Sequence, residues 1–231
     1  MDEPELLARF LLVRHGESQV MVDGVVGGML TCSGLSDLGR VQAAALRERF
    51  ARGTEPEIDV VYASPMPRAR ETTDIALPAL GGGVAGHEVH THLELEEFRL
   101  GEADGMAWDA VREKYGELFG KNSHPYQPLI PGGDSRAGFR HRVATALAEI
   151  TEEHRGSTIF VGCHGGVVNA GMLQAFDLSV GHPVVDLPTV VTSVTELEHR
   201  FSATAGHRWL VRRYNDSVHL HGTELDPRDD R

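Results

Sequence analysis

The chain has 231 residues, of which 41% are hydrophobic and 24% are charged, and these proportions are ordinary for a globular protein. Its 34 acidic residues outnumber 22 lysines and arginines, and the net charge of −12 argues against non-specific binding to nucleic acid or to anionic membranes. No apolar run approaches the ~20 residues of a membrane-spanning helix, and the acidic start of the chain resembles neither a secretory signal nor a transit peptide. We therefore expect a cytoplasmic protein.

Cysteine and histidine content bears on redox and metal chemistry. The two cysteines, Cys32 and Cys163, are expected to be reduced thiols. Thirteen histidines occur, but no Cys-x-x-Cys pair and no His-Glu-x-x-His motif is present. The nearest approach to a ligand cluster is His90 and His92 with His87 close by, and we interpret it as a solvated strand face. We expect no metal site and no cofactor.

Strands and helices alternate along the first half of the chain. Ser36 can cap a helix that Gly53 ends, and Pro67 suits the first turn of another helix. A loop without hydrophobic period follows the first strand directly, so we expect it to line the site. The expected elements are a strand at about 8–14, the loop at 17–34, a helix at 37–52, a strand at 58–63, a helix at 67–77 and a strand at 87–93.

The second half continues this alternation and closes with two strands. Asp134 is the expected N-cap of a long helix that Gly156 ends. The last two strands have no helix between them and should pair as a hairpin, whose free edge could also pair with a second copy in a homodimer. The expected elements are an excursion at about 98–133 with a helix at 106–119, then a helix at 134–154, a strand at 158–162, a helix at 166–176 and strands at 190–198 and 207–214.

This order predicts an α/β fold with a three-layer α/β/α sandwich. The central sheet should be mostly parallel and should end in the C-terminal antiparallel hairpin. We expect residues 1–231 to form a single domain, in which the excursion at about 98–133 extends over the active site.

Polar side chains follow four of the predicted strands. Arg14 and His15 come after the first strand, and Arg68 comes after the second, at a helix start. Glu97 and His164 follow the third and fourth strands. Because ligands bind outside the carboxyl ends of the strands in open α/β sheets, these groups should meet at one edge.

Two arginines, two histidines and a carboxylate suit one kind of chemistry. Arginines bind phosphate oxygens, an unprotonated histidine is a nucleophile, and a carboxylate beside a bound phosphate has a raised pKa and can act as a general acid. The set predicts phosphoryl transfer through a phosphohistidine without a metal. From the residues alone, Arg70 is as good a candidate as Arg68, and Glu96 is an alternative to Glu97.

The first of these motifs, Arg14-His15-Gly16-Glu17, resembles the signature of the histidine phosphatase superfamily, which includes the cofactor-dependent phosphoglycerate mutases. The resemblance covers most of the chain in the order of the family. It continues through Leu35-Ser36-Asp37-Leu38-Gly39, Ser64-Pro65-Met66-Pro67-Arg68-Ala69, Glu97 with Gly101 and Gly105, Pro131-Gly132-Gly133-Asp134-Ser135 and His164-Gly165-Gly166.

The resemblance implies a role for each of these groups. His15 would be the phosphorylated nucleophile, and Glu97 would protonate the leaving alkoxide and then activate water. Arg14, Arg68 and His164 would hold the phosphoryl group and stabilise its charge in the transition state. The residues expected to bind substrate are Arg14, Gly16, Ser18, Arg68 and Gly165.

Departures from the mutase pattern favour a phosphatase. Phe98-Arg99-Leu100-Gly101 stands where the mutases carry Arg-His-Tyr-Gly, and Met21 stands where the family often has Asn. We predict a metal-independent phosphomonoester hydrolase that acts on a small phosphorylated metabolite through a phosphohistidine. A 2,3-bisphosphoglycerate-dependent phosphoglycerate mutase is one alternative, and a non-catalytic phosphoryl-binding protein is another. Glu97 stands four residues before Gly101, and this spacing favours it as the general acid, with Glu96 still an alternative.

Overall fold

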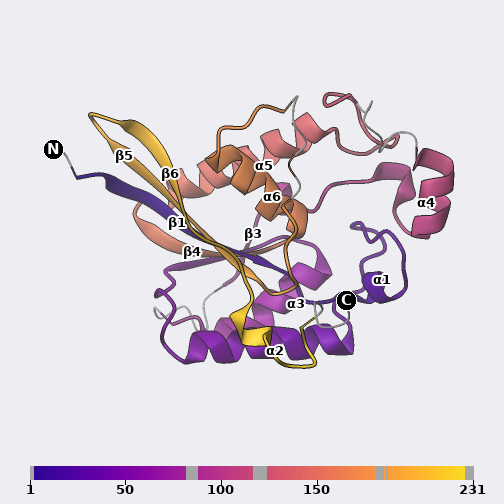
Figure 1. Ribbon diagram of the computed structural model, residues 1–231, viewed down its shortest axis with the longest axis horizontal. Helices are drawn as coiled ribbons and strands as arrows, with labels where there is room; N and C mark the ends of the chain where they lie inside the picture. Colours follow the sequence, from indigo (N-terminus) through magenta and orange to yellow (C-terminus); the bar gives the residue numbers. More distant parts are fainter. Residues whose placement is uncertain (1–2, 82–87, 117–123, 181–184, 186, 227–231) are drawn as a thin grey trace.

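A six-stranded sheet lies between two pairs of helices in the computed structural model, which describes residues 3–81, 88–116, 124–180, 185 and 187–226 (Figure 1). The elements are β1 (Glu5–Arg14), α1 (Gln19–Val22), α2 (Asp37–Ala51), β2 (Val60–Ala63), α3 (Pro67–Ala76), β3 (His90–Thr91), α4 (Trp108–Tyr115), α5 (Arg136–Glu153), β4 (Ser157–Cys163), α6 (Gly165–Ala175), β5 (Val194–Ser202) and β6 (Gly206–Asp216), with 3-10 turns η1 (Leu77–Ala79), η2 (Leu93–Leu95), η3 (Gly101–Ala103) and η5 (Val218–Leu220). The predicted α/β/α sandwich is confirmed.

The strand order is β3-β2-β4-β1-β5-β6. The first four strands are parallel, β5 runs antiparallel beside β1, and β6 runs antiparallel to β5, so the predicted hairpin is confirmed. Arg14 of β1 pairs with Cys163 of β4, and Ala63 of β2 pairs with Gly162. The carboxyl ends of these three strands are therefore level, and the residues that follow them start from one edge.

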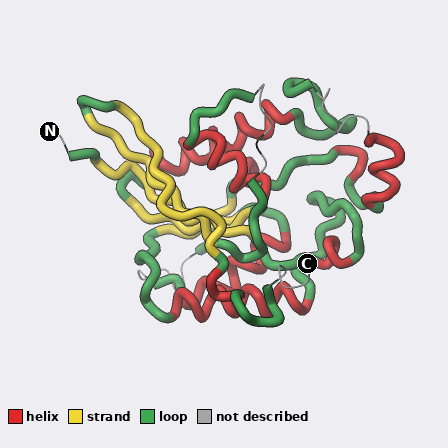
Figure 2. Tube along the Cα trace, viewed as in Figure 1, coloured by secondary structure: helices red, strands yellow, loops and turns green. Residues whose placement is uncertain are grey.

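Both faces of the sheet are covered by helices, which Figure 2 shows in red on either side of the yellow strands. Along β1, Phe10 and Leu12 pack in the cluster that includes side chains of α5 and α6. Leu11 and Val13 point the other way, into the cluster with α2 and α3. A strand that is buried on both faces needs a continuous apolar run, which explains the composition of β1.

The long helix α5 does not begin as predicted. Ser135, not Asp134, is its N-cap, because the Ser135 hydroxyl accepts a hydrogen bond from the N–H of Gly138 at 3.0 Å. The Asp134 carboxylate instead accepts hydrogen bonds from Arg142 at 2.7 Å and from the N–H of Arg99 at 2.9 Å. The side chain of Asp134, which the sequence predicted as the N-cap, thus forms a tertiary ion pair with Arg142 instead.

Two strands begin later in the chain than expected. In the described residues β3 covers His90–Thr91, because it pairs with just two residues at the end of β2. The strand predicted from residue 190 begins at Val194, since a turn precedes it in which the N–H of Ser193 bonds the carbonyl of Val190 at 3.2 Å.

The excursion and the loop after β1 pack against each other. Val111 and Tyr115 of α4 share a small apolar core with Val26, Ala103 and Ile130. Figure 1 accordingly shows α1 and α4 on the same side of the sandwich. The helix predicted at 106–119 is observed over Trp108–Tyr115, and its expected end falls in 117–123, outside the described residues.

In the described part of the chain, no helix combines the length and the apolar character needed to cross a membrane.

Candidate active site

His15 lies at the end of β1, with its imidazole almost fully buried. Its Nδ1 atom is 2.6 Å from the carbonyl oxygen of Gly16, and because a carbonyl can only accept, Nδ1 must carry the ring proton. Nε2 then has a lone pair, which accepts a hydrogen bond from Nε of Arg68 at 3.0 Å. The structure therefore holds the imidazole in one tautomer.

Burial lowers the pKa of His15 well below its usual 6.5, and the charges of Arg68 and Arg14 lower it further. The ring is therefore neutral at neutral pH, as a nucleophile must be.

Arg68 stands in the first turn of α3, directly after Pro67, and its side chain is buried. Besides His15, its guanidinium binds the carbonyl oxygen of Gly27 at 2.8 Å, which ties it to the loop after β1. Arg70, the alternative left open by the sequence, forms an ion pair with Asp74 instead. The structure thus brings Arg68, and not Arg70, to His15.

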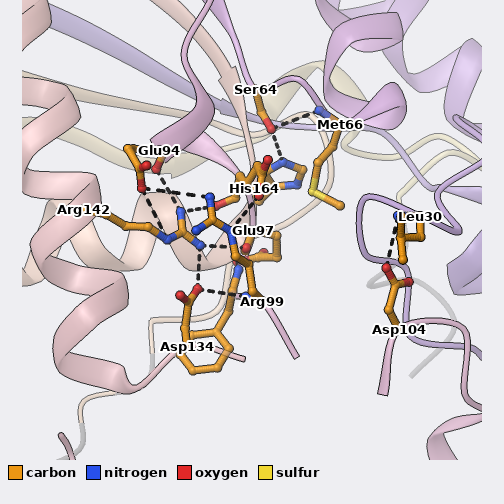
Figure 3. Close-up of polar contacts among 12 residues, drawn as sticks. Leu30, Ser64, Met66, Glu94, Glu97, Arg99, Asp104, Asp134, Arg142 and His164 are labelled. Atoms are coloured by element: carbon orange, nitrogen blue, oxygen red, sulfur yellow. Dashed lines mark hydrogen bonds and ion pairs between the residues drawn. The ribbon is translucent and has the colours of Figure 1, made fainter. Parts of the chain in front are cut away.

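His164 occupies the N-cap position of α6 and is fully buried. Its Nε2 atom lies 2.8 Å from the hydroxyl oxygen of Ser64, and its ring stands edge-on to that of His15 with the centroids 5.2 Å apart (Figure 3 shows the Ser64 contact). Burial, followed by the charge of Arg68, lowers the pKa of His164 well below 6.5, so it too is neutral. The sequence did not single out Ser64 as its partner, although Ser64 follows β2.

Arg14 is the last residue of β1, and its guanidinium donates to the carbonyl of Thr189. Gly165 lies beside it, because a Cβ at that position would be 3.7 Å from Nε of Arg14 and 3.0 Å from Oγ1 of Thr189. Arg14 Nε, Nδ1 of His164 and the Ser18 hydroxyl are buried polar atoms that have no hydrogen-bond partner within the described residues. Such atoms call for an explanation, and an oxygen atom of an anion is a suitable partner for each of them.

Gly16 is engaged within the protein. Its N–H donates to the hydroxyl of Thr72 at 3.1 Å, and a Cβ there would lie 2.6 Å from the carbonyl oxygen of Gly39. The glycine thus allows close packing of the strand end on α2. Substrate binding by Gly16 stays a prediction.

The two candidate acids point in different directions. Glu97 accepts hydrogen bonds from the N–H of Gly166 at 3.0 Å and from its neighbour Phe98 at 2.8 Å, so its carboxylate lies at the N-terminus of α6. Glu96 instead forms an ion pair with Arg99 at 2.7 Å. The structure therefore brings Glu97, not Glu96, to the shared edge. A Cβ on Gly166 would lie 2.1 Å from Oε1 of Glu97, so a side chain at this position would displace the carboxylate.

Arg142 of α5 holds the backbone that carries Glu97. Its guanidinium donates to the carbonyl oxygens of Glu94 at 2.9 Å, Glu96 at 2.8 Å and Glu97 at 2.9 Å (Figure 3). Its remaining strong partner is the Asp134 carboxylate. Sequence reasoning missed Arg142, although an arginine three residues after Phe139, on the apolar stripe of α5, was a signal of a buried role.

The remaining predicted residues take other places. Burial, followed by the charge of Glu97, raises the pKa of the Cys163 thiol, so this fully buried group is an inert part of the core. Cys163 and Cys32 are both free cysteines. Met21 lies on α1 and is 44% exposed.

The histidines near β3 have partners of their own. His90 stacks on the ring of Tyr62 with centroids 5.1 Å apart, and His92 lies 3.1 Å from the carboxylate of Glu149. His87 lies outside the described residues. Across the ranges that the structure describes, no group of three or more His, Cys, Asp or Glu side chains is placed to hold a metal ion.

The buried Arg68, the partly buried Arg14, two neutral histidines and a carboxylate held by a helix N-terminus thus meet at the carboxyl edge of a mostly parallel sheet. This arrangement is typical of an enzyme site that handles a phosphoryl group.

Comparison with known proteins identifies the family. Residues 10–217 match the histidine phosphatase superfamily (branch 1). The chain is 30% identical over 94% of its length to phosphoglycerate mutase-like protein 4 of Arabidopsis thaliana, of which it covers 88%. The chain therefore belongs to the histidine phosphatase superfamily.

Other relatives carry the names of phosphatases and of mutases. The metal-independent phosphoserine phosphatase of Arabidopsis thaliana is 27% identical over 93% of this chain and 84% of its own length. Several bacterial relatives are named 2,3-bisphosphoglycerate-dependent phosphoglycerate mutases. Among solved structures, YhfR of Bacillus stearothermophilus superimposes with a TM-score of 0.74 at 26% identity, over 92% of this chain and 99% of that one.

Proposed function

We propose that the protein is a metal-independent phosphomonoester hydrolase that acts on a small phosphorylated metabolite through a phosphohistidine at His15. The observation that carries the proposal is the state of the His15 ring. Its proton is held on Nδ1 by the Gly16 carbonyl, which leaves the Nε2 lone pair directed at Arg68. A neutral nucleophile beside a buried guanidinium suits attack on a phosphoryl group that the same guanidinium binds.

In the first step Nε2 of His15 bonds to phosphorus, and the bond from phosphorus to the ester oxygen breaks. The leaving alkoxide takes a proton from the carboxyl group of Glu97. For this to occur, Nε of Arg68 has to transfer its hydrogen bond from His15 to a phosphate oxygen. Nε of Arg14, Nδ1 of His164 and the Ser18 hydroxyl, which have no hydrogen-bond partner in the described residues, supply further donors to that phosphoryl group.

In the second step the Glu97 carboxylate takes a proton from water as the water oxygen bonds to phosphorus. The bond between phosphorus and Nε2 breaks, inorganic phosphate leaves, and both His15 and Glu97 return to their starting states. The same residue serves first as acid and then as base.

The relative named metal-independent phosphoserine phosphatase supports hydrolysis as the outcome. The departures at Phe98–Gly101 and at Met21 support it too. Because other relatives are named as mutases, mutase activity is the alternative that has to be measured.

The first prediction tests this proposal. Wild-type protein should hydrolyse p-nitrophenyl phosphate equally well with and without EDTA, and His15→Ala should lose at least about a thousandfold in kcat. Acid-labile phosphate should be trapped on wild type and not on His15→Ala. His141→Ala, at an exposed histidine of α5, is the matched control and should keep wild-type activity.

Three results would contradict the proposal. Phosphate binding without hydrolysis across a range of pH would indicate a non-catalytic phosphoryl-binding protein. Loss of activity in EDTA would contradict the metal-independent mechanism. Faster interconversion of 2- and 3-phosphoglycerate than ester hydrolysis, dependent on 2,3-bisphosphoglycerate, would indicate a mutase.

A further inference from the structure

A cavity of about 320 Å³ lies between α5 and α6, next to the active site. This volume falls at the lower end of the ~300–1,000 Å³ typical of small-molecule pockets. Among the described residues, most of the side chains that line it are apolar, and they include Phe98, Phe139, Ala170, Leu173, Leu178 and Val180.

The cavity adjoins the proposed general acid directly. Phe98 and Gly166 both line it, and the N–H groups of these two residues hold the Glu97 carboxylate. A Cβ built on Gly166 would lie 2.1 Å from Oε1 of Glu97 and 3.2 Å from the Cζ atom of Phe139. The carboxylate and the aromatic wall of the cavity therefore approach the same side of one glycine, with no side chain between them.

The charged groups on the wall have partners within the protein. The Arg140 guanidinium donates to the backbone carbonyls of Leu178 and Ser179, which fastens that segment to α5 as the outer wall. Arg136 is likewise engaged. The cavity therefore offers a mainly hydrocarbon surface to an occupant, with Asn169 and Ser179 as the uncharged polar side chains on its described wall.

We propose that this cavity binds the apolar part of the alcohol that the reaction releases. The preferred substrates are then phosphomonoesters of alcohols that carry an aliphatic chain or an aromatic ring. The ester oxygen lies at Glu97 and the hydrocarbon extends from there into the adjoining cavity. This inference rests on the proposed hydrolase function and names its substrate class.

The second prediction follows from burial of hydrocarbon. Along ethyl, butyl and hexyl phosphate, kcat/KM of the wild type should rise by up to about fourfold for each added methylene that enters the cavity. Hexyl phosphate should also be preferred to phosphoserine and to 3-phosphoglycerate, which have no long hydrocarbon chain to bury in the cavity. A flat series, or a preference for either charged substrate, would overturn the proposal.

Substitutions of Leu173 test whether the dependence of kcat/KM on chain length arises in this cavity. Leu173→Trp fills it and Leu173→Ala removes part of its wall, and both should lower the ratio of kcat/KM for hexyl phosphate over ethyl phosphate by at least about fivefold. Phe176→Trp is the matched control, because Phe176 is a half-exposed residue at the end of α6 that does not line the cavity. Equal ratios in wild type and both Leu173 variants would contradict the assignment.

A binding measurement separates this inference from the proposed function. Hexylphosphonate and ethylphosphonate, which cannot be hydrolysed, are titrated calorimetrically into wild type. Tighter binding of hexylphosphonate, reduced in Leu173→Trp, supports the cavity even if no ester is hydrolysed, in which case the hydrolase proposal alone fails. Equal affinities with normal p-nitrophenyl phosphate hydrolysis overturn the cavity assignment and leave the hydrolase proposal standing.

Discussion

Arg142 fixes the position of the Glu97 carboxylate although it does not touch it. Three backbone carbonyls from 94–97 converge on its guanidinium, and the planar fork of arginine can serve them together with Asp134. A lysine has a single ammonium group and cannot reproduce this geometry. Arg142 is therefore a positioning residue for the general acid.

The third prediction is that Arg142→Lys lowers kcat/KM for alkyl phosphates about 10- to 100-fold, because this constant reports the steps up to release of the alcohol and a displaced acid protonates the alkoxide poorly. Its effect on p-nitrophenyl phosphate should be much smaller, since p-nitrophenolate leaves without protonation. Steady-state kinetics on both esters provides the measurement. Arg112→Lys, in an exposed pair with Asp109, is the control, and equal losses on the two esters would indicate general structural damage instead.

At the scale of elements, one buried carboxylate joins three strands. Glu198 of β5 is 1% exposed and pairs with Arg9 of β1 at 2.9 Å, with Arg200 at 2.7 Å and with Arg212 of β6 at 3.0 Å. Burial acts to raise the pKa of Glu198, but the hydrogen bonds from Arg212 and Arg200 outweigh it and lower the pKa to about 2. The hairpin is thus fastened to the parallel part of the sheet through a carboxylate that stays ionised.

The fourth prediction concerns this carboxylate. Glu198→Gln should lower the free energy of unfolding at pH 7 by about 2–4 kcal/mol, because it removes the anion that pairs with Arg200 and Arg212 and leaves Arg9 with Glu196 alone. Since the folded pKa is depressed, the contribution of Glu198 is present above the unfolded pKa of about 4.3 and is lost as the pH falls toward 2. Urea unfolding at pH 7 and near pH 3 should show a smaller difference at the lower pH.

Glu152→Gln is the matched control, because the Glu152 side chain is 71% exposed in its pair with Arg155. Its effect should stay within about 0.5 kcal/mol. A loss as small for Glu198→Gln would mean that the three ion pairs contribute nothing beyond their desolvation cost.

Some elements and site residues could be predicted from the sequence, and others could not. Apolar runs followed by polar residues located Arg14, His15 and His164, because each is set by its own strand and the carboxyl ends of parallel strands are level. The sequence could predict the hairpin but not its docking beside β1, since that register depends on contacts distant in the chain. The partner of His164 and the cap of α5 were out of reach for the same reason, because Ser64 and Arg142 act through tertiary hydrogen bonds.

At the scale of the whole molecule, buried neutral histidines make folding sensitive to acid. Burial lowers the pKa of His15 and of His164 well below 6.5, and burial followed by the charge of Arg49 lowers that of His219 to about 4. His219 follows the last strand and bonds the hydroxyl of Thr192 at 2.9 Å, so it belongs to the packing of the C-terminal region. As the pH falls below 6.5 the unfolded chain binds protons that the folded protein does not accept.

The fifth prediction is that the free energy of unfolding falls steadily from pH 6.5 toward pH 4. The sign follows from linkage, because stability rises with pH wherever the unfolded state holds more protons. Each such histidine contributes at most about 1.4 kcal/mol per pH unit in that window. His219→Gln can keep a hydrogen bond to Thr192 without titrating, so its slope in urea unfolding should be smaller by up to one proton, whereas His141→Gln at an exposed site should keep the parental slope. An unchanged slope in His219→Gln would mean that His219 takes up its proton at the same pH in the folded and the unfolded protein. The acid sensitivity of the protein would then have to come from His15 and His164 in the active site.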